Sequence, residues 1–225
     1  MARPLNREKS KTRTLVLHSA TKLFIERGYS ETRIKDIADD SGVGYGEIFR
    51  LYGDKDTLLS QLIDLVFEHQ FEFSKKFLEG KTDDNLFAYI FEAVLQLYIS
   101  ESSDHIREMY ALSYSLPNTS HKIYDYITTK LENAFGGYLP NYQTKDFYEL
   151  EIASAGIMRG YIINPCTMYF TVDRKVRRFI ETTCKIYEVS KDKIEDTINF
   201  ISQFDMKKCA NLVLNTLFEY ISDRT

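Results

Sequence analysis

Hydrophobic residues recur at three- and four-residue intervals along almost the whole chain, which is the spacing of one buried helix face. Near the start, Leu17, Ala20 and Phe24 follow this spacing, and Gly28 ends the run. Later segments are separated by proline, glycine or Asn-Pro, and they predict helices at about 84–101, 104–115, 119–135, 145–163, 173–188, 191–203 and 206–222. Because no period-two alternation is long enough for a sheet, the pattern predicts an all-α protein of about nine to eleven helices.

The longest predicted helix covers about residues 55–79. Asp54 precedes it, and aspartate is a favoured cap because its carboxylate accepts from the unpaired amides of the first turn. Leu58 and Leu62 start its inward face, and Gly80 ends it. A helix of this length can complete an N-terminal domain and also connect that domain to the rest of the chain.

Residues 32–52 predict two short helices joined by a glycine turn. We expect Thr32 to cap the first helix, with Ile34 and Ile37 facing inward. Gly42 supplies the positive φ at which the first helix ends.

The second short helix is expected to open at Gly44 and to bury Ile48 with either Leu51 or Tyr52. Four of its residues then face outward: Tyr45, Gly46, Phe49 and Arg50. This arrangement is typical of a helix-turn-helix: two short helices, a tight turn, and an outer face of polar and aromatic residues. Such a motif places its second helix in the major groove of DNA.

An ordered set of residues extends this pattern on both sides. An apolar-Ala-x-x-Leu-Phe helix ends at Gly-Tyr, and a Thr-x-x-x-Ile-Ala helix, a Gly-Val turn, a second short helix and a Lys-x-x-Leu-Leu start follow. In this set, residues 10–65 resemble the DNA-binding region of the TetR family of bacterial transcriptional regulators. The matching residues are Val16, Ala20, Leu23, Phe24, Gly28, Tyr29, Thr32, Ile37, Ala38, Gly42, Val43, Gly46, Phe49, Lys55, Leu58 and Leu59.

The resemblance implies an N-terminal three-helix module followed by a larger helical region for ligand binding and dimerisation. We therefore expect a DNA-binding domain at residues 1–55 and a second domain at 56–225, with the helix at 55–79 shared. The implied partners are a double-stranded DNA operator, a small-molecule inducer and a second copy of the chain. No cofactor is implied.

Charge is divided unevenly between these two regions. Residues 1–55 hold 11 Lys or Arg against 8 Asp or Glu, whereas residues 56–225 hold 18 against 25. A basic module on an acidic protein fits nucleic acid at one end only. Five basic residues at the start, Arg3, Arg7, Lys9, Lys11 and Arg13, are either a solvated terminus or an arm that follows phosphates.

Nine residues are the candidates for DNA contact: Thr32, Arg33, Lys35, Gly44, Tyr45, Gly46, Phe49, Arg50 and Lys55. Arginine suits guanine edges or phosphates, and glycine lets the backbone approach the duplex. A lysine in the first turn of a helix, as at Lys55, is favoured when it shares a phosphate with the free amides; the alternative is a solvated side chain.

Three positions depart from the family pattern. Gly44 stands where relatives usually have Ser or Thr, and Phe49 replaces the usual tyrosine. Glu47 brings a negative charge to the outer face, unless it reaches back to the amide of residue 44 as half of a capping box.

Residues 56–225 contain 26 of the 31 Phe and Tyr residues. Six tyrosines in the middle helices are candidates for a ligand pocket: Tyr89, Tyr98, Tyr110, Tyr114, Tyr124 and Tyr126. Such a set either packs the core or gives an apolar pocket hydroxyl groups with which to bind a flat or lipophilic molecule.

Two late helices, 145–163 and 206–222, are the candidates for a dimer interface. The first carries small residues at helical spacing, and the second is strongly apolar. The proposed contacts are Ala153, Gly156, Gly160, Val213, Leu217 and Phe218; the alternative is that both helices close the core of one protomer.

The remaining chemistry is sparse. Cys166, Cys184 and Cys209 have no metal-binding spacing and suit reduced thiols in the cytoplasm. No apolar stretch reaches the roughly 18 residues of a membrane span, and no catalytic constellation is recognisable. The sequence thus predicts a ligand-released repressor with no enzymatic activity; the alternative is a helical ligand- or protein-binding module that no longer uses DNA.

Overall fold

Eleven α-helices make up residues 4–222, the part of the chain that this computed structural model describes; side chains are described for residues 11–219. The helices are α1 (Pro4–Arg27), α2 (Ile34–Ser41), α3 (Tyr45–Tyr52), α4 (Lys55–Leu78), α5 (Asn85–Ser100), α6 (Asp104–Ser113), α7 (Pro117–Phe135), α8 (Thr144–Ile163), α9 (Val172–Ile186), α10 (Lys191–Ser202) and α11 (Met206–Ser222). The all-α prediction is confirmed, and the predicted bounds from residue 55 onward agree within two residues. Of the five residues in the hypothesis of a basic arm, Arg3 and the side chains of Arg7 and Lys9 lie outside the described residues.

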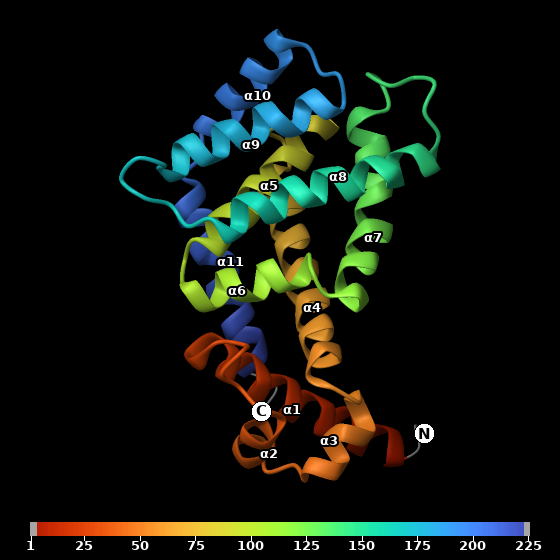
Figure 1. Cartoon of the computed structure of the whole chain (residues 1–225), viewed down its shortest axis with the longest axis vertical. Coiled ribbons are helices and arrows are strands. Elements are labelled where there is room, and N and C mark those ends of the chain that lie inside the picture. The colour runs from red at the N-terminus through yellow and green to blue at the C-terminus, as the bar shows by residue number, and fades with distance from the viewer. Residues whose placement is uncertain (1–3, 223–225) are drawn as a thin grey trace.

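The first three helices form a small unit at one end of the molecule, and α4 runs from it into the larger helical region (Figure 1). There α5 lies at the centre and packs on α4, α6, α7, α9, α10 and α11. Its burial follows from its composition, because Glu92 is the one charged residue between Asn85 and Ser100. A single hydrophobic cluster runs from Val16 to Leu217.

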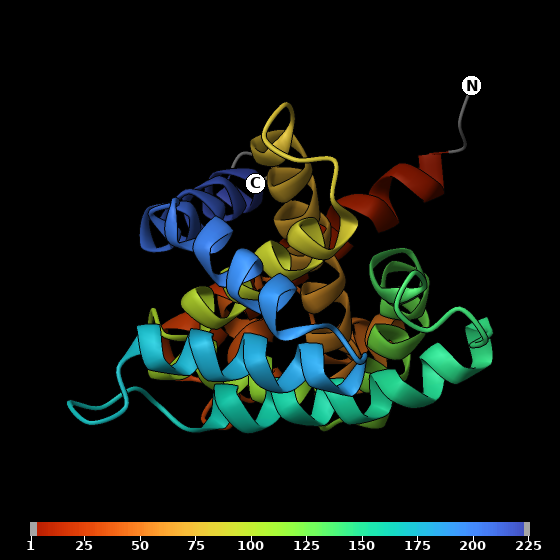
Figure 2. The ribbon, with the colours of Figure 1, turned by 90° about the horizontal axis from the view of Figure 1, so that it is seen from above.

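The seam between the small unit and the larger region is apolar. Side chains from α1, α4, α6 and α11 meet there, among them Ile25, Leu62, Met109 and Leu217. The larger region is layered: α8 and α9 lie side by side on one flank, and α11 lies on another (Figure 2). No helix within residues 4–222 is long and apolar enough to cross a membrane.

Candidate nucleic-acid interface and ligand cavity

The outer face of α3 is the most exposed aromatic surface of the small unit. Tyr45 is 56% exposed and Phe49 is 61% exposed, while Ile48 and Tyr52 on the opposite face are buried. A Cβ atom added at Gly44 or at Gly46 would meet no atom within 4 Å. The sequence-predicted face is therefore present, and it is open enough for a second molecule to reach the backbone.

Arg50 on this face is paired within its own helix. Its Nη2 lies 2.6 Å from Oε1 of Glu47. The suggestion that Glu47 caps the helix is wrong, because no side chain caps α3 and the carboxylate holds Arg50 instead. Both side chains are partly exposed, so the pair is a weak, solvent-screened one that a phosphate or a base can displace.

Arg33 and Lys35 are exposed at the start of α2, and their contact with a DNA backbone stays a prediction. Thr32 differs from its prediction. It is fully buried, and its hydroxyl donates to the carbonyl of Gly28 at 2.8 Å. Helix α2 begins at Ile34, and the carboxylate that accepts at its start is that of Asp36, from the Arg33 amide at 2.8 Å. Thr32 therefore ties the α1–α2 turn together and cannot touch DNA through its side chain.

Lys55 also supports this turn. Its Nζ donates to the carbonyl oxygens of Tyr29 at 2.8 Å and Thr32 at 2.9 Å, and lies 4.1 Å from the centre of the Tyr29 ring. Burial lowers the pKa of the ammonium. The Tyr29 hydroxyl donates to Asp56, which fixes the same turn to the start of α4. Sequence reasoning proposed a phosphate contact for Lys55; the geometry adds a structural role to that prediction.

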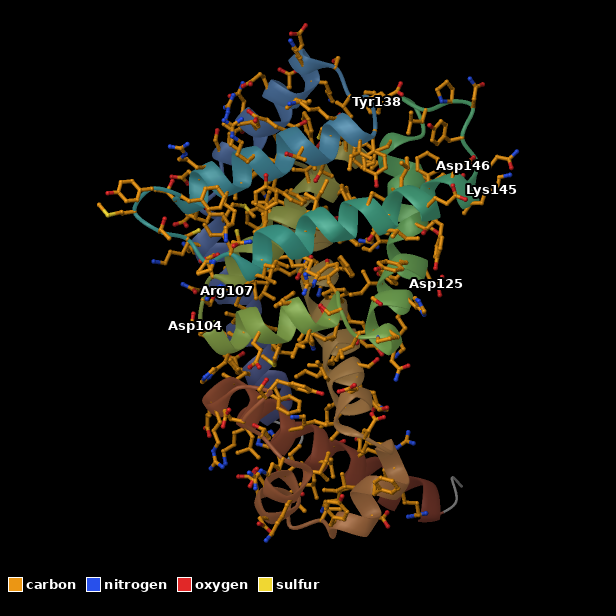
Figure 3. All side chains as sticks on the ribbon, viewed as in Figure 1. Asp104, Arg107, Asp125, Tyr138, Lys145 and Asp146 are labelled. Atoms are coloured by element: carbon orange, nitrogen blue, oxygen red, sulfur yellow. The ribbon has the colours of Figure 1, made fainter. Side chains whose placement is uncertain are left out.

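The larger region holds the turn from its other side, through α6. Glu108 accepts from the amide of Tyr29 at 2.9 Å and from the amide of Ser30 at 3.2 Å, and also from the Ser30 hydroxyl. Nδ1 of His105 lies 2.8 Å from the carbonyl oxygen of Ile25. Asp104 and Arg107 form an ion pair at the start of this helix, which lies over α1 (Figure 3).

Gly28 is required at this contact for two reasons. Its φ is +89°, and an added Cβ would lie 2.9 Å from Oε2 of Glu108 and 3.2 Å from the His105 ring. The sequence correctly predicted a helix stop at Gly28. It gave no sign of the α6 side chains packed against it, because they lie about 80 residues away in the chain.

A small cavity of about 30 Å³, here called the chamber, lies between α4, α5, α7 and α8. Tyr89 and Tyr114, two of the six candidate tyrosines, line it together with Gln70, Gln96 and Glu151, which sequence reasoning missed. The hydroxyl of Tyr114 donates to Oε1 of Gln96 at 3.1 Å. The sequence signal that could have pointed to the chamber is Glu151, a glutamate on the apolar face of α8.

Glu151 is buried in the wall of the chamber. Ser154 donates to its Oε2 at 2.6 Å, and the hydroxyl of Tyr187 lies 3.0 Å from the Ser154 oxygen. Burial raises the pKa of Glu151 to about 8, which the hydrogen bond from Ser154 only partly opposes. The carboxyl is therefore mostly protonated at neutral pH.

A larger, open groove of about 270 Å³ lies beside the chamber between α4 and α7. Tyr126 lines it, and its ring stacks on Phe71 with a centroid distance of 5.0 Å. Phe67 and Phe71, one turn apart on α4, line both spaces. These two rings are the wall between the chamber and the groove.

The other three candidate tyrosines lie elsewhere. Tyr110 is buried and donates to Gln70 at 3.2 Å. Tyr98 lies 3.4 Å from Asp173 of α9, and Tyr124 packs edge-on against Tyr148. The six tyrosines therefore do not form one belt.

The two predicted dimer helices do not share a face. Helix α11 packs on α4 and α5, whereas α8 packs on α6, α7 and α9 (Figure 2). Val213 and Leu217 are each 2% exposed, so the prediction that they contact a partner is wrong: they fill the protomer's own core. Phe218 is partly exposed.

The outer face of α8 keeps an unpartnered stripe. Ala153 and Gly156 are exposed, Gly160 is half-buried, and Ile152 and Ile163 are large exposed apolar residues in the same stripe. Lys145 marks its N-terminal end (Figure 3).

Residues 16–62, which include α2, α3 and the start of α4, match the family described as bacterial regulatory proteins, tetR family. The N-terminal domain belongs to the TetR family. The all-α fold, with a larger C-terminal helical region, agrees with that assignment.

Curated relatives match this TetR-family domain. A transcriptional repressor of the helix-turn-helix type from Mycobacterium tuberculosis is 47% identical over 49 residues, which cover 22% of this chain and 26% of the repressor. The transcriptional regulator AcrR of Shigella flexneri is 35% identical over 81 residues, which cover 34% of this chain and 38% of AcrR. The chain thus spans only about a quarter to two fifths of their length.

Solved structures resemble the whole fold. RolR in complex with resorcinol superposes with a TM-score of 0.65 over 88% of this chain and 97% of RolR, at 16% identity. An ArpA-like gamma-butyrolactone receptor gives a TM-score of 0.51 over 89% of this chain and 98% of the receptor, at 17% identity. At such identities the likeness concerns the fold alone.

Proposed function

We propose that this TetR-family protein is a DNA-binding transcriptional repressor that a small molecule releases from its operator. The observation that carries the proposal is the exposed outer face of α3, where Tyr45, Phe49 and Arg50 stand beside the open positions of Gly44 and Gly46. An α-helix of this kind fits the major groove of B-DNA. Exposed aromatic residues that lie close together on a protein surface indicate a binding surface, and DNA would cover Tyr45 and Phe49 here.

In this proposal the side chains divide into two groups. Tyr45 and Arg50 contact base edges, whereas Arg33, Lys35 and Lys55 contact phosphates, Lys55 through the N–H that the turn carbonyls leave available. The glycines let the backbone come close. Thr32 acts indirectly, by fixing the turn on which α2 and α3 stand.

The protein acts as a homodimer in the bacterial cytoplasm, because a single α3 reads only one half-site. A second copy covers the stripe on α8, where small residues permit close approach and Ile152 and Ile163 are otherwise exposed. Two recognition helices then have to match half-sites about one helical turn apart.

Release follows from the position of α6 between the chamber and the DNA-binding domain. Tyr110 on α6 and Tyr114 at its end hold Gln70 and Gln96 of the chamber, and Glu108 in the middle of the same helix holds the α1–α2 turn. A ligand that displaces the chamber side chains shifts α6 or α4 and so the spacing of the recognition helices. This requires a ligand affinity that differs between two arrangements. The likeness to a resorcinol-bound structure supports a small-molecule site in this fold.

The alternative is a ligand-binding protein that does not use DNA, which the Glu47–Arg50 pair and Phe49 favour. Titration of the full chain with its own upstream DNA at several salt concentrations separates the two. We expect salt-dependent, sequence-specific binding. Lys55→Ala should lower the salt slope by about one unit, and Tyr45→Ala should alter base preference. Equal, weak binding to all sequences would reject the repressor.

A further inference from the structure

The chamber contains a hydrogen-bond donor that has no acceptor. Gln96 is 5% exposed, and among the described residues its Nε2 has no hydrogen-bond partner. Its Oε1 is occupied by the Tyr114 hydroxyl, which fixes the amide plane and leaves the NH₂ group as the unused end. A buried donor without an acceptor costs free energy. A bound molecule that offers an acceptor to this NH₂ group would recover that cost.

The chamber as it stands holds water-sized molecules only. Its wall toward the groove is made of Phe67 and Phe71, and Phe71 is packed outward against the exposed ring of Tyr126. If Phe71 turns away, the chamber and the groove join into a space of roughly 300 Å³, the lower end of the range for small-molecule pockets. The lining of Phe67, Tyr89 and Phe179 suits an aromatic ring.

The charges around the chamber disfavour an anion. Glu92 and the neutral carboxyl of Glu151 both line it, so the charge beside the chamber is that of Glu92. The nearby cation, Lys130, is already paired with Glu92 at 2.6 Å, and its Nζ lies 3.7 Å from the Phe71 ring centre. An anionic ligand would have to break this pair or approach the Glu92 carboxylate, whereas a neutral oxygen needs only the N–H of Gln96.

We infer that the chamber binds an uncharged molecule of about one aromatic ring, whose acceptor oxygen takes the free N–H of Gln96 and which enters through the α4–α7 groove past Phe71. The inference rests on the proposed ligand response and names the chemical class of that ligand. The ring lies among the aromatic side chains of the chamber, and its oxygen points toward α5. The protonated state of Glu151 fits this neutral environment, since a cation would favour its ionised form.

The test uses three single-ring probes of nearly the same shape and the full-length protein. Acetophenone carries a neutral acceptor, α-methylstyrene replaces that oxygen by a CH₂ group, and benzoate carries a negative charge. Titration calorimetry and thermal unfolding should show acetophenone binding at least about tenfold more tightly than either of the others, which is the worth of one buried hydrogen bond. Equal affinities, or no binding of acetophenone up to its solubility limit, would overturn the inference.

Variants identify the donor. Gln96→Met should abolish the preference for acetophenone over α-methylstyrene, whereas Tyr114→Phe, which keeps the amide, should retain it. Thr183→Val is the matched control, because the Thr183 hydroxyl is also buried with no partner among the described residues but lies outside the chamber lining. A preference that survives in Gln96→Met would reject the assigned donor.

DNA titration in the presence of acetophenone separates this inference from the repressor proposal. Binding that depends on Gln96 but leaves DNA affinity unchanged supports the chamber assignment and counts against ligand-controlled release. A loss of DNA affinity that Gln96→Met does not change supports ligand-controlled release and rejects the chamber assignment.

Discussion

Glu108 of α6 accepts the backbone N–H of Tyr29 at 2.9 Å, across the seam between the larger helical region and the TetR-family domain. The same carboxylate accepts from the backbone N–H of Ser30. Gly28 has no side chain, which leaves room for the Glu108 carboxylate. Beside the apolar contacts of the seam, the joint therefore has a polar part, in which Glu108 and His105 of α6 bind backbone groups at the end of α1 and in the α1–α2 turn. Hydrogen bonds to a charged acceptor are stronger than those between neutral groups, so this carboxylate holds the two regions in one orientation.

We predict that Glu108→Ala loosens this turn. The amides of Tyr29 and Ser30 lose their acceptor, so their hydrogen exchange should become faster, while amides in the middle of α8 should exchange as before. The free energy of unfolding should fall by about 1–3 kcal/mol. Glu26→Ala, which removes an exposed carboxylate from α1, is the control and should change neither quantity. If the Tyr29 amide exchanges as slowly in Glu108→Ala as in the parent chain, the α1–α2 turn does not depend on Glu108 for its stability.

A second prediction concerns the recognition helix. Glu47→Gln removes the partner of Arg50 and a negative charge from the proposed DNA face. Affinity for DNA should rise several-fold, and the salt dependence should become steeper by up to about one unit, because Arg50 becomes available for a phosphate. Glu72→Gln removes the charged partner of Lys76 in a more exposed pair on α4 and should have no effect. If Glu47→Gln weakens binding instead, Glu47 is itself a base contact.

The sequence predicted the fold because the helix signals are local. The spacing of hydrophobic residues shows where helices run. Asp54 marks the start of α4, and the positive-φ glycines Gly28 and Gly42 mark the ends of α1 and α2. It failed where two nearby partners competed. Thr32 could accept from an amide or donate to a carbonyl, and the buried carbonyl of Gly28 is the partner it found. Glu47 could cap the start of α3 or pair with Arg50. It pairs with Arg50, whose positive charge attracts the carboxylate.

The chamber was harder to predict because its polar residues come from distant segments. The Tyr114–Gln96 and Ser154–Tyr187 contacts depend on how α5, α8 and the ends of α6 and α9 pack. Apolar composition also could not tell an interface from a core. Leu217 is buried within the protomer, whereas Ile152, on a less apolar face, is 49% exposed.

A third prediction follows from the buried carboxyl of Glu151. The titratable groups that face it are Tyr89, Tyr114 and Tyr187, and within the described residues no lysine or arginine donates to it. Its pKa is raised from 4.5 to about 8, so between these values the native state holds a proton that the unfolded chain releases. Stability should therefore fall as pH rises through this window, by up to about 1.4 kcal/mol per pH unit.

Urea unfolding at several pH values between about 5 and 8 measures this effect. In Glu151→Gln, which keeps an acceptor for Ser154, the fall with pH should be smaller than in the parent chain. Glu149→Gln removes an exposed carboxylate from the same helix and should leave the pH dependence unchanged. Parallel curves for the parent and Glu151→Gln would mean that Glu151 is ionised in the native state.

The last prediction tests the dimer through Gly156. A Cβ atom added at this exposed position would meet no other part of its own protomer within 4 Å, so Gly156→Leu should fold as well as the parent or slightly better, given the low helix propensity of glycine. If a second copy packs closely on the α8 stripe, the same leucine overpacks the contact by about 1–3 kcal/mol, which raises the dissociation constant roughly 5- to 150-fold. Sedimentation should then show a folded monomer where the parent is dimeric, while Lys75→Leu, at an exposed position on α4, should remain a dimer. A parent chain that is monomeric at micromolar concentration, or a Gly156→Leu variant that dimerises equally well, would exclude this face as the interface.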